Sequence, residues 1–112
     1  HELVALAKRE IREITPAELA TGGTDPPLLI DVREPNEVAI EAYPDAVVVP
    51  LSGFDPGLIP DPGFTQVVFA CRSGKRSVTA SLVAQEAGLP HDSHLEGGIL
   101  AWKQAGLPTK SG

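Results

Sequence analysis

The chain has 112 residues, a length typical of one domain, so we expect a single core with one functional site. Its formal net charge of −6 argues against binding to nucleic acid or to an anionic membrane, because both need a broad basic surface. The one cysteine cannot form an internal disulfide, and with three scattered histidines it lacks the paired ligands of a structural zinc site. We therefore predict a domain without a disulfide or a bound metal.

The hydropathy of the chain, its first residue and its unpaired thiol bear on the cellular compartment of the domain. No apolar stretch approaches the roughly 20 residues that a membrane-spanning helix requires, so we expect a soluble domain. The chain contains no Met and begins with His1, which indicates that the natural N-terminus and any targeting segment lie outside it. We interpret residues 1–10 as a peripheral helix or a replacement for natural residues, and residues 1–112 as one domain. An unpaired thiol suits a reducing compartment, so the hypothesis is a cytoplasmic domain, and a monomer is the default expectation.

The first elements are expected near the N-terminus. A short strand is predicted at residues 12–14. The capping-box pattern at residues 15–18 (TPAE) predicts a short helix through Ala20, which a Gly-Gly pair ends. The apolar residues 28–30, before Asp31, predict a strand that is buried on both faces.

The middle of the chain predicts a helix, a strand and an irregular segment. Pro35 fits the first turn of a helix that runs to about Ala42, and residues 46–49 read as a second buried strand. Residues 51–64 are rich in Gly, Pro and Asp, which favours a surface segment that could wall a pocket.

The last elements include the strongest strand prediction, residues 66–70 (QVVFA), followed by a helix at residues 77–87. A short strand near residues 93–95 and a helix from about Gly98 to Ala105 complete the chain. Strands that alternate with helices predict an α/β fold, with a central, mostly parallel sheet of about five strands and helices on both faces.

The loop that begins at Cys71 is the candidate site. Ligands bind at the carboxyl ends of parallel strands, and this loop lies between such an end and a helix N-terminus. Gly74 lets the backbone curl so that its N–H groups can face an anion, and Arg72, Lys75 and Arg76 add positive charge. Both effects favour the thiolate, which is the nucleophilic form of cysteine. A buried structural cysteine is the alternative, but three cations at a helix N-terminus are unfavourable unless an anion is present.

Four segments, in this order, resemble the rhodanese family. They are DVREPNE at residues 31–37, CRSGKRS at 71–77, LEGGILAW at 95–102 and GLP at 106–108. Each segment alone is a weak match, but together they cover most of the chain at the spacing of a single domain. The resemblance implies a rhodanese-like fold and a sulfurtransferase that needs no cofactor.

The resemblance also implies roles for individual residues. Cys71 would take sulfur from a donor such as thiosulfate, hold it as a persulfide and pass it to a thiophilic acceptor such as cyanide, a thiol or a protein. The substrate-binding residues would be Arg72, Ser73, Gly74, Lys75, Arg76 and Ser77. Asp31 and Arg33 match the Asp-x-Arg pair of the family, and we interpret them as a supporting ion pair rather than as catalytic groups.

Some residues near the C-terminus receive no chemical role. His91 and His94 flank the last predicted strand outside the cysteine loop, so we interpret them as hydrogen-bonded or solvated rather than as a general base. Gly97 and Gly98 are expected to form a tight turn before the last helix, with Trp102 in the core.

One segment differs from the family. After the DVREPNE helix the family commonly has Gly-His-Ile-x-Gly-Ala, whereas residues 42–47 here are Ala-Tyr-Pro-Asp-Ala-Val. Because two glycines and a histidine are absent, we expect this turn to differ in conformation from that of the family. We expect no change in the cysteine loop.

Two other functions remain as alternatives. A phosphatase or arsenate reductase would also use a cysteine loop, but the phosphatase motif has five residues between Cys and Arg, whereas four separate Cys71 from Arg76 and position 77 is Ser. A non-catalytic binding or regulatory module would keep the fold and only recognise a partner. The intact cysteine loop favours an active sulfurtransferase over both.

Overall fold

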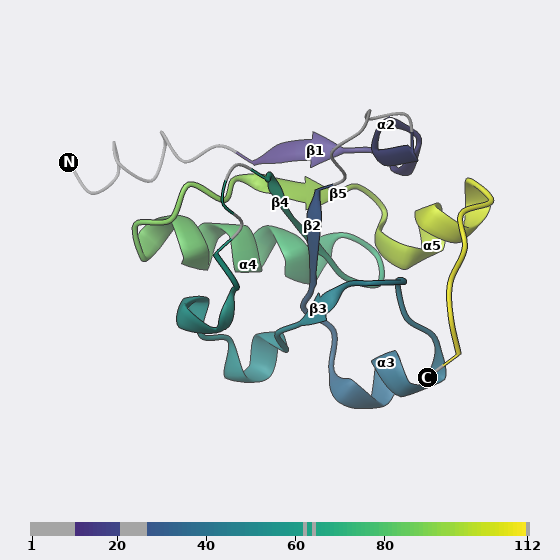
Figure 1. Ribbon diagram of the computed structural model, residues 1–112, viewed down its shortest axis with the longest axis horizontal. Helices are drawn as coiled ribbons and strands as arrows, with labels where there is room; N and C mark the ends of the chain where they lie inside the picture. The colour runs from purple at the N-terminus through teal and green to yellow at the C-terminus, as the bar shows by residue number, and fades with distance from the viewer. Residues whose placement is uncertain (1–10, 21–26, 62, 64, 112) are drawn as a thin grey trace.

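Five parallel strands form one sheet at the centre of the computed structural model, in the order β1-β5-β4-β2-β3 (Figure 1). The structure describes residues 11–20, 27–61, 63 and 65–111. The strands are β1 (Arg12–Ile14), β2 (Leu28–Asp31), β3 (Val47–Val48), β4 (Val67–Ala70) and β5 (Ser93–Leu95). The predicted α/β fold with a parallel sheet is confirmed. Residues 1–10, with their expected helix, and the Gly22-Gly23 pair lie outside the described residues.

Helices cover both faces of this sheet. Helix α4 (Lys75–Glu86) packs on one face, and α2 (Pro16–Ala20) and α5 (Gly98–Gln104) pack on the other (Figure 1). Helix α3 (Pro35–Ile40) follows β2 beyond its carboxyl end. The buried side of α4 consists of small residues at helical spacing, which lets the helix lie close to the sheet: Ser77, Ala80, Ser81 and Ala84.

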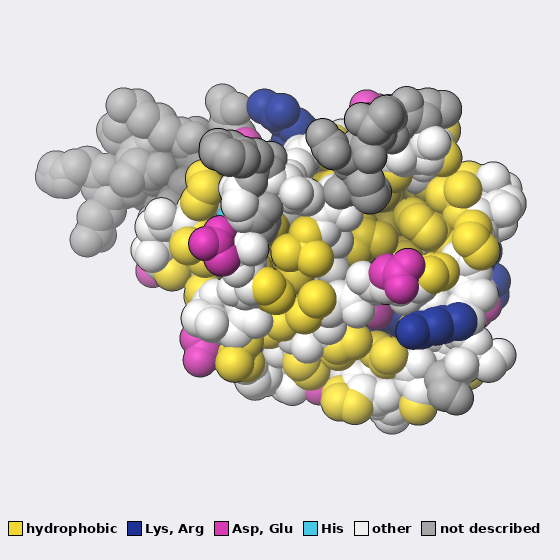
Figure 2. All heavy atoms as spheres, in the orientation of Figure 1, with side chains coloured by type: hydrophobic (Ala, Val, Ile, Leu, Met, Phe, Trp, Pro, Cys, Tyr) yellow, Lys and Arg dark blue, Asp and Glu magenta, His cyan; other side chains and the backbone are white. Residues whose placement is uncertain are grey.

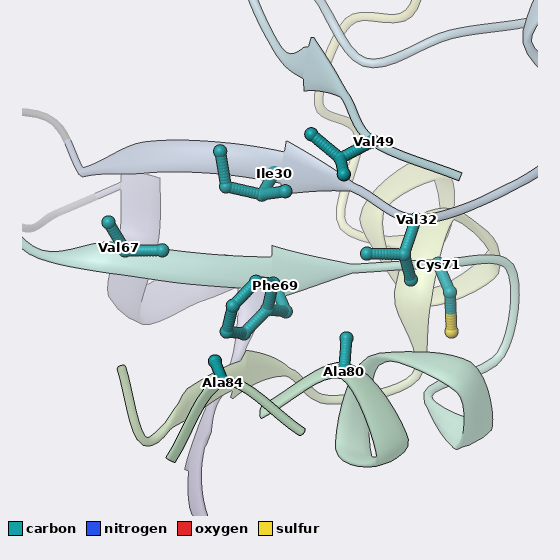
Figure 3. Packing of buried hydrophobic residues seen from close by; sticks show 8 residues of the cluster. All are labelled: Ile30, Val32, Val49, Val67, Phe69, Cys71, Ala80 and Ala84. Carbon is teal, nitrogen blue, oxygen red and sulfur yellow. The ribbon is translucent and has the colours of Figure 1, made fainter. Parts of the chain in front are cut away.

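The hydrophobic core is divided between the two faces because side chains alternate along each strand. Toward α4, Ile30 and Phe69 pack with Ala80 and Ala84 (Figure 3). Toward α5 lies a second cluster made of Leu29, Tyr43, Val68, Ala70, Leu95 and Ile99, with Trp102 partly buried against it. All four residues of β4 are buried, as the apolar run at residues 66–70 predicts.

The start of α2 follows the capping-box prediction. The backbone N–H of Glu18 donates to Thr15 Oγ1 at 3.1 Å, and the Thr15 N–H donates to the Glu18 carboxylate at 3.1 Å. Two donors that a helix start leaves unpaired are thereby satisfied.

Three elements differ from the sequence expectations by more than one residue at an end or in burial. The strand predicted at residues 46–49 is present as β3, but it lies at the sheet edge and has only two residues, with Val48 exposed, so its predicted burial was wrong. Helix α3 ends at Ile40 instead of about Ala42, because Ala42 forms a β-bridge with Lys110. Helix α4 begins at Lys75, two residues early, since Gly74 with φ of 101° serves as its N-cap.

The turn at residues 42–47 keeps one feature of a glycine-containing turn. Asp45 has φ of 61°, in the left-handed region that favours Gly. Asp and Asn tolerate this region better than most residues do. Residues 51–61 run over the surface as expected and contain two 3₁₀ turns, Leu51–Gly53 and Pro56–Leu58. No helix in the described part of the chain is long and apolar enough to span a bilayer.

Phe69 anchors the α4 side of the core, and its truncation should destabilise the fold. It is fully buried and lies edge-to-face with Phe54. We expect Phe69→Ala to lower the free energy of unfolding by about 3–5 kcal/mol, measured by urea denaturation, because it leaves a cavity. Ile40→Ala, at a site that is 78% exposed, is the matched control and should change it by less than about 0.5 kcal/mol. Equal effects of the two substitutions would contradict the assigned core.

Candidate functional site

The cysteine loop lies at the carboxyl end of β4, in the middle of the sheet. Cys71 directly follows the strand, and its sulfur points toward the first turn of α4 (Figure 3). Only 1% of Cys71 is exposed. Helix α4 starts four residues later, so residues 71–74 make a tight curl whose backbone N–H groups lie near the sulfur. The loop therefore forms the anion-binding geometry that the sequence predicts.

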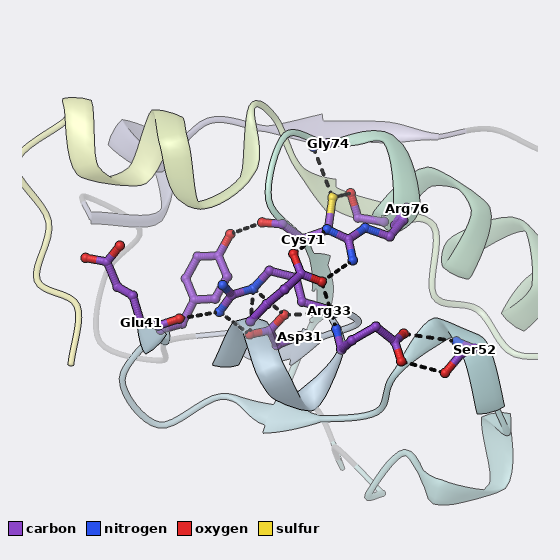
Figure 4. A network of polar contacts seen from close by, with 11 residues as sticks. Asp31, Arg33, Glu41, Ser52, Cys71, Gly74 and Arg76 are labelled. Carbon is purple, nitrogen blue, oxygen red and sulfur yellow. Dashed lines mark hydrogen bonds and ion pairs between the residues drawn. The ribbon is translucent and has the colours of Figure 1, made fainter. Parts of the chain in front are cut away.

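The sulfur of Cys71 is held by hydrogen bonds. The Gly74 N–H donates to Sγ at 3.0 Å, and the Ser77 hydroxyl lies 3.5 Å from Sγ (Figure 4). Burial raises the pKa of the Cys71 thiol, but hydrogen bonds from the Ser77 hydroxyl and from the backbone of Ser77, Gly74 and Ser73 outweigh it. The net effect lowers the pKa, so the loop stabilises the thiolate.

The carbonyl groups of the loop are held from the other face of the sheet. The Tyr43 hydroxyl donates to the Cys71 carbonyl at 2.7 Å, and the Ile99 N–H donates to the same oxygen at 2.9 Å. The Leu100 N–H donates to the Arg72 carbonyl at 3.2 Å. The first turn of α5 therefore fixes the loop backbone, and with it the direction of the N–H groups.

Gly98 makes this contact possible. Its φ is 59°, and a Cβ at this position would lie 2.5 Å from the Cys71 carbonyl oxygen and overlap the Arg72 carbonyl group as well. No other residue could bring the α5 backbone so close to the loop. The sequence predicts a tight turn at Gly97 and Gly98, and the structure confirms it. The structure also shows that this turn packs against the carbonyl groups of Cys71 and Arg72.

Asp31 and Arg33 form a buried ion pair at the carboxyl end of β2. Arg33 Nη2 lies 2.8 Å from Asp31 Oδ2 and 2.9 Å from the Glu41 carbonyl, to which it donates (Figure 4). The guanidinium also lies 5.5 Å from the centre of the Tyr43 ring. Because the Tyr43 hydroxyl holds the Cys71 carbonyl, the pair supports the loop through Tyr43 and does not touch the sulfur.

The three cations of the loop differ in their partners. Arg76 forms a bidentate ion pair with Glu37, with N–O distances of 2.5 and 2.8 Å (Figure 4). Arg72 and Lys75 are exposed, and their side chains have no hydrogen bond or ion pair with any described residue. The charge of Arg76 is thus largely offset, which leaves Arg72 and Lys75 as the cations that are free to meet an anion.

His94 is a part of this region that the sequence analysis gave no role. It lies in the middle of β5, only 3% exposed, with Nδ1 2.9 Å from Ser77 Oγ. The expectation that it is hydrogen-bonded holds, but its partner is the residue that also contacts the Cys71 sulfur. The alternation of β5 could have shown this, because His94 shares a face with α4 whereas Leu95 points to the opposite core.

A separate apolar cavity lies on the α5 side of the sheet. Its volume is 660 Å³, and its described lining includes Leu19, Leu29, Trp102 and Leu107 but no residue of the cysteine loop. Hydrophobic side chains gather at the surface around α5 (Figure 2).

Within the described ranges, no three His, Cys, Asp or Glu side chains come together as potential metal ligands.

Comparison with protein families gives a match over most of the chain. Residues 15–105 match the model of the Rhodanese-like domain. A protein named sulfurtransferase from Allochromatium vinosum is 38% identical over 85 residues, which cover 76% of this chain and 79% of that protein. The uncharacterized protein slr1261 from Synechocystis is 46% identical over 85 residues, but these span only 48% of its length.

Solved structures show the same fold. A rhodanese-related protein from Thermoplasma volcanium superimposes with a TM-score of 0.76 at 25% identity, over 90% of this chain and 99% of that one. A protein from Rhodopseudomonas palustris, described as a possible tyrosine phosphatase, gives a TM-score of 0.70 at 28% identity, over 89% and 85%.

The close approach at Gly98 generates a stability prediction. Gly98→Ala adds a steric clash to the strain of a positive φ, whereas Gly106→Ala, with φ of 79° and open space around it, adds only the strain. We expect Gly106→Ala to cost about 1–2 kcal/mol and Gly98→Ala about 1–3 kcal/mol more, in urea denaturation. If both substitutions lower the free energy of unfolding by the same amount, the first turn of α5 is not in close contact with the cysteine loop.

The ion pair at Glu37 generates a pH prediction. The hydrogen-bonded Arg76 guanidinium lowers the pKa of Glu37 from its usual 4.5 to about 2. A carboxylate with a lowered pKa stabilises the fold above its ordinary pKa and loses that effect as the pH falls toward 2. Glu37→Gln should therefore lose less unfolding free energy than the wild type does over this range, in urea titrations at several pH values.

A matched control exists for this prediction. Glu37 Oε1 also accepts the Glu34 N–H at 3.1 Å, and the Gln oxygen can keep that bond. Glu96→Gln removes an exposed carboxylate that has no ion pair with a described residue, so it should follow the wild type. Parallel curves for Glu37→Gln and the wild type would contradict the role of this ion pair. Partial exposure of both side chains keeps the effect small.

Proposed function

This chain belongs to the rhodanese-like domain family, and we propose that it is a sulfurtransferase that carries sulfur as a persulfide on Cys71. The observation that carries the proposal is the position of the single cysteine in a curl of backbone N–H groups, where the Gly74 N–H donates to Cys71 Sγ at 3.0 Å. The same groups that stabilise a thiolate also suit a persulfide anion, because the charge on the outer sulfur remains near the loop.

The reaction has two steps with thiosulfate as the donor. The Cys71 thiolate attacks the outer sulfur of thiosulfate, the bond between the two sulfur atoms breaks, and sulfite leaves with the electron pair. A nucleophilic acceptor then attacks the outer sulfur of the persulfide, and the Cys71 thiolate leaves. Cyanide gives thiocyanate, and a thiolate gives a new persulfide. Neither step needs an external oxidant or a bound cofactor.

Charges around the loop support an anionic donor. Arg72 and Lys75 are the exposed cations that no described residue neutralises, so we assign them to the first contact with the donor. The Ser73, Gly74 and Ser77 backbones hydrogen-bond to Cys71 Sγ, the atom to which the transferred sulfur becomes bound. Arg76 acts indirectly, because its ion pair with Glu37 ties α3 to the start of α4.

The partners and the compartment are part of the same proposal. The acceptor is a thiol or a protein, since cyanide is only a convenient laboratory acceptor. The net charge of −6 disfavours nucleic acid and anionic membranes as partners, and a small anion would bind at the local basic loop. We place the domain in the cytoplasm, because a free reactive thiol persists in reducing surroundings. A monomer is the default state that we assign to it. Because the chain spans about half of the Synechocystis relative, these assignments concern this domain alone.

A phosphatase is the second candidate, favoured by the description of the Rhodopseudomonas protein. A phosphatase needs an arginine that faces the bound phosphate. Here Arg76, the nearest match, is bound on both outer nitrogens by Glu37. The loop is also one residue shorter than the phosphatase motif, which suits a sulfur atom better than a phosphoryl group. A non-catalytic module is the third candidate, but it would not require a stabilised thiolate.

Replacement of the cysteine tests the proposal. We expect the wild type to produce thiocyanate from thiosulfate and cyanide, and to gain the mass of one sulfur atom after treatment with thiosulfate alone. Cys71→Ser should lose both, because a hydroxyl group cannot form a persulfide. Intact-mass spectrometry and a colorimetric thiocyanate assay measure the two results.

Controls separate the three candidates. Lys110→Ala removes a cation outside the loop and should leave sulfur transfer unchanged. Phosphatase turnover with no sulfur uptake would favour the second candidate. A folded wild type that takes up no sulfur from thiosulfate or from a low-molecular-weight persulfide, and that hydrolyses no phosphate, would favour the binding module.

A further inference from the structure

A buried histidine follows two apolar core residues in a row of side chains under α4. In the register of the sheet, Ile30 pairs with Phe69, Phe69 with His94, and His94 with Glu13. Paired residues of parallel strands point to the same face, so all four side chains lie on the α4 side. Ile30 and Phe69 are core residues, whereas His94 places an imidazole in the same layer at 3% exposure. A buried polar side chain in such a row needs partners.

The partners of His94 connect the Cys71 sulfur to the protein surface. His94 Nδ1 lies 2.9 Å from Ser77 Oγ, and Ser77 Oγ lies 3.5 Å from Cys71 Sγ. On the other side of the ring, Nε2 lies 3.5 Å from Glu13 Oε2. The Glu13 side chain is 60% exposed. Sulfur, hydroxyl, imidazole and carboxylate therefore form one continuous chain of polar groups from the buried thiol to solvent.

The Ser77 hydroxyl has one hydrogen, so it can donate to only one of its two neighbours at a time. When His94 Nδ1 has no proton, Ser77 donates to the ring and can only accept from the Cys71 thiol. When Nδ1 carries a proton, the ring donates to Ser77, and the Ser77 hydrogen turns toward the sulfur. The protonation of His94 thus decides whether Ser77 faces a thiol as an acceptor or a thiolate as a donor.

We propose that His94 is a positioning residue for Cys71, which takes up the thiol proton through Ser77 and then turns the Ser77 hydroxyl toward the thiolate. This inference rests on the proposed role of Cys71 as the nucleophile. The proton of the thiol moves to Ser77 Oγ, and the Ser77 proton moves to His94 Nδ1. The products are a thiolate and an imidazolium, so charge and protons balance. Glu13 stabilises the imidazolium from the solvent side.

The groups that face His94 agree with this role. Strand β1 contributes the Glu13 carboxylate, α4 contributes the Ser77 hydroxyl, and β4 contributes the apolar Phe69 ring. The ring also lies against the cysteine loop, because a Cβ on Gly74 would be 3.7 Å from His94 Cε1. The Glu13 carboxylate faces Nε2 and the Ser77 hydroxyl faces Nδ1, so a proton on Nδ1 has Ser77 as its partner.

The test measures the thiolate directly. Thiolate absorbance is recorded against pH, with Cys71→Ala as the blank, so the buried sulfur need not meet a reagent. His94→Asn keeps a hydrogen-bonding atom near the position of Nδ1 but cannot take up a proton. We expect the titration midpoint of Cys71 to rise and the thiolate fraction at pH 7 to fall about tenfold, the change that corresponds to about one pKa unit.

Two further variants control this result. His91→Asn changes another buried histidine, whose ring faces Phe69, and should leave the thiolate titration unchanged. Glu13→Gln removes the carboxylate charge at an exposed position and should raise the midpoint by a smaller amount. If His94→Asn does not fold, as judged by circular dichroism, Glu13→Gln decides the question.

The outcomes separate this inference from the proposed function. A thiolate titration in His94→Asn that coincides with the wild type overturns the role of His94, as does an equal rise in His91→Asn. For an unfolded His94→Asn, a wild-type titration in Glu13→Gln does the same. None of these measurements uses a sulfur donor. If the wild type transfers no sulfur but the Cys71 titration midpoint rises in His94→Asn as expected, the sulfurtransferase proposal is refuted. The coupling of His94 to Cys71 is then still supported.

Discussion

The contact between the cysteine loop and the first turn of α5 is the constraint on which the site depends. The Cys71 carbonyl accepts from both the Tyr43 hydroxyl and the Ile99 N–H, and this geometry requires Gly98, which has no side chain to intervene. A carbonyl fixed on one side of a peptide fixes the direction of the next N–H group on the other side. The curl of N–H groups around the sulfur is therefore imposed from the opposite layer of the protein.

The charged groups around the loop act mainly as supports. The buried pair of Asp31 and Arg33 holds Tyr43 in place, and Glu37 engages Arg76 at the start of α4. Removal of one partner from a buried pair leaves an uncompensated charge, which is why such pairs keep elements in fixed positions. Burial raises the pKa of the Cys71 thiol, and hydrogen bonds from Ser77, Gly74 and Ser73 more than offset that effect. The exposed cations are then free to act on a ligand.

The two layers of the protein have different relations to the sulfur. The α5 layer holds the backbone of the loop, whereas the α4 layer supplies side chains that contact the thiol, through Ser77 and behind it His94. The apolar cavity near Trp102 belongs to the α5 side and is separate from this chemistry. The thiol of Cys71, at the centre of the sheet, is thus contacted by side chains from one face, while its backbone is held in position from the other.

The sequence by itself determined most of the elements and the candidate cysteine loop. Apolar runs, the capping box at Thr15 and the loop pattern at Cys71 are local signals, because they depend on residues close together in the chain. Only the tertiary structure decided that β3 is an edge strand, that Arg76 is neutralised by Glu37, and that His94 reaches Ser77. Strand order and contacts between distant segments follow from packing of the whole chain, and no local pattern encodes which side chains packing brings together.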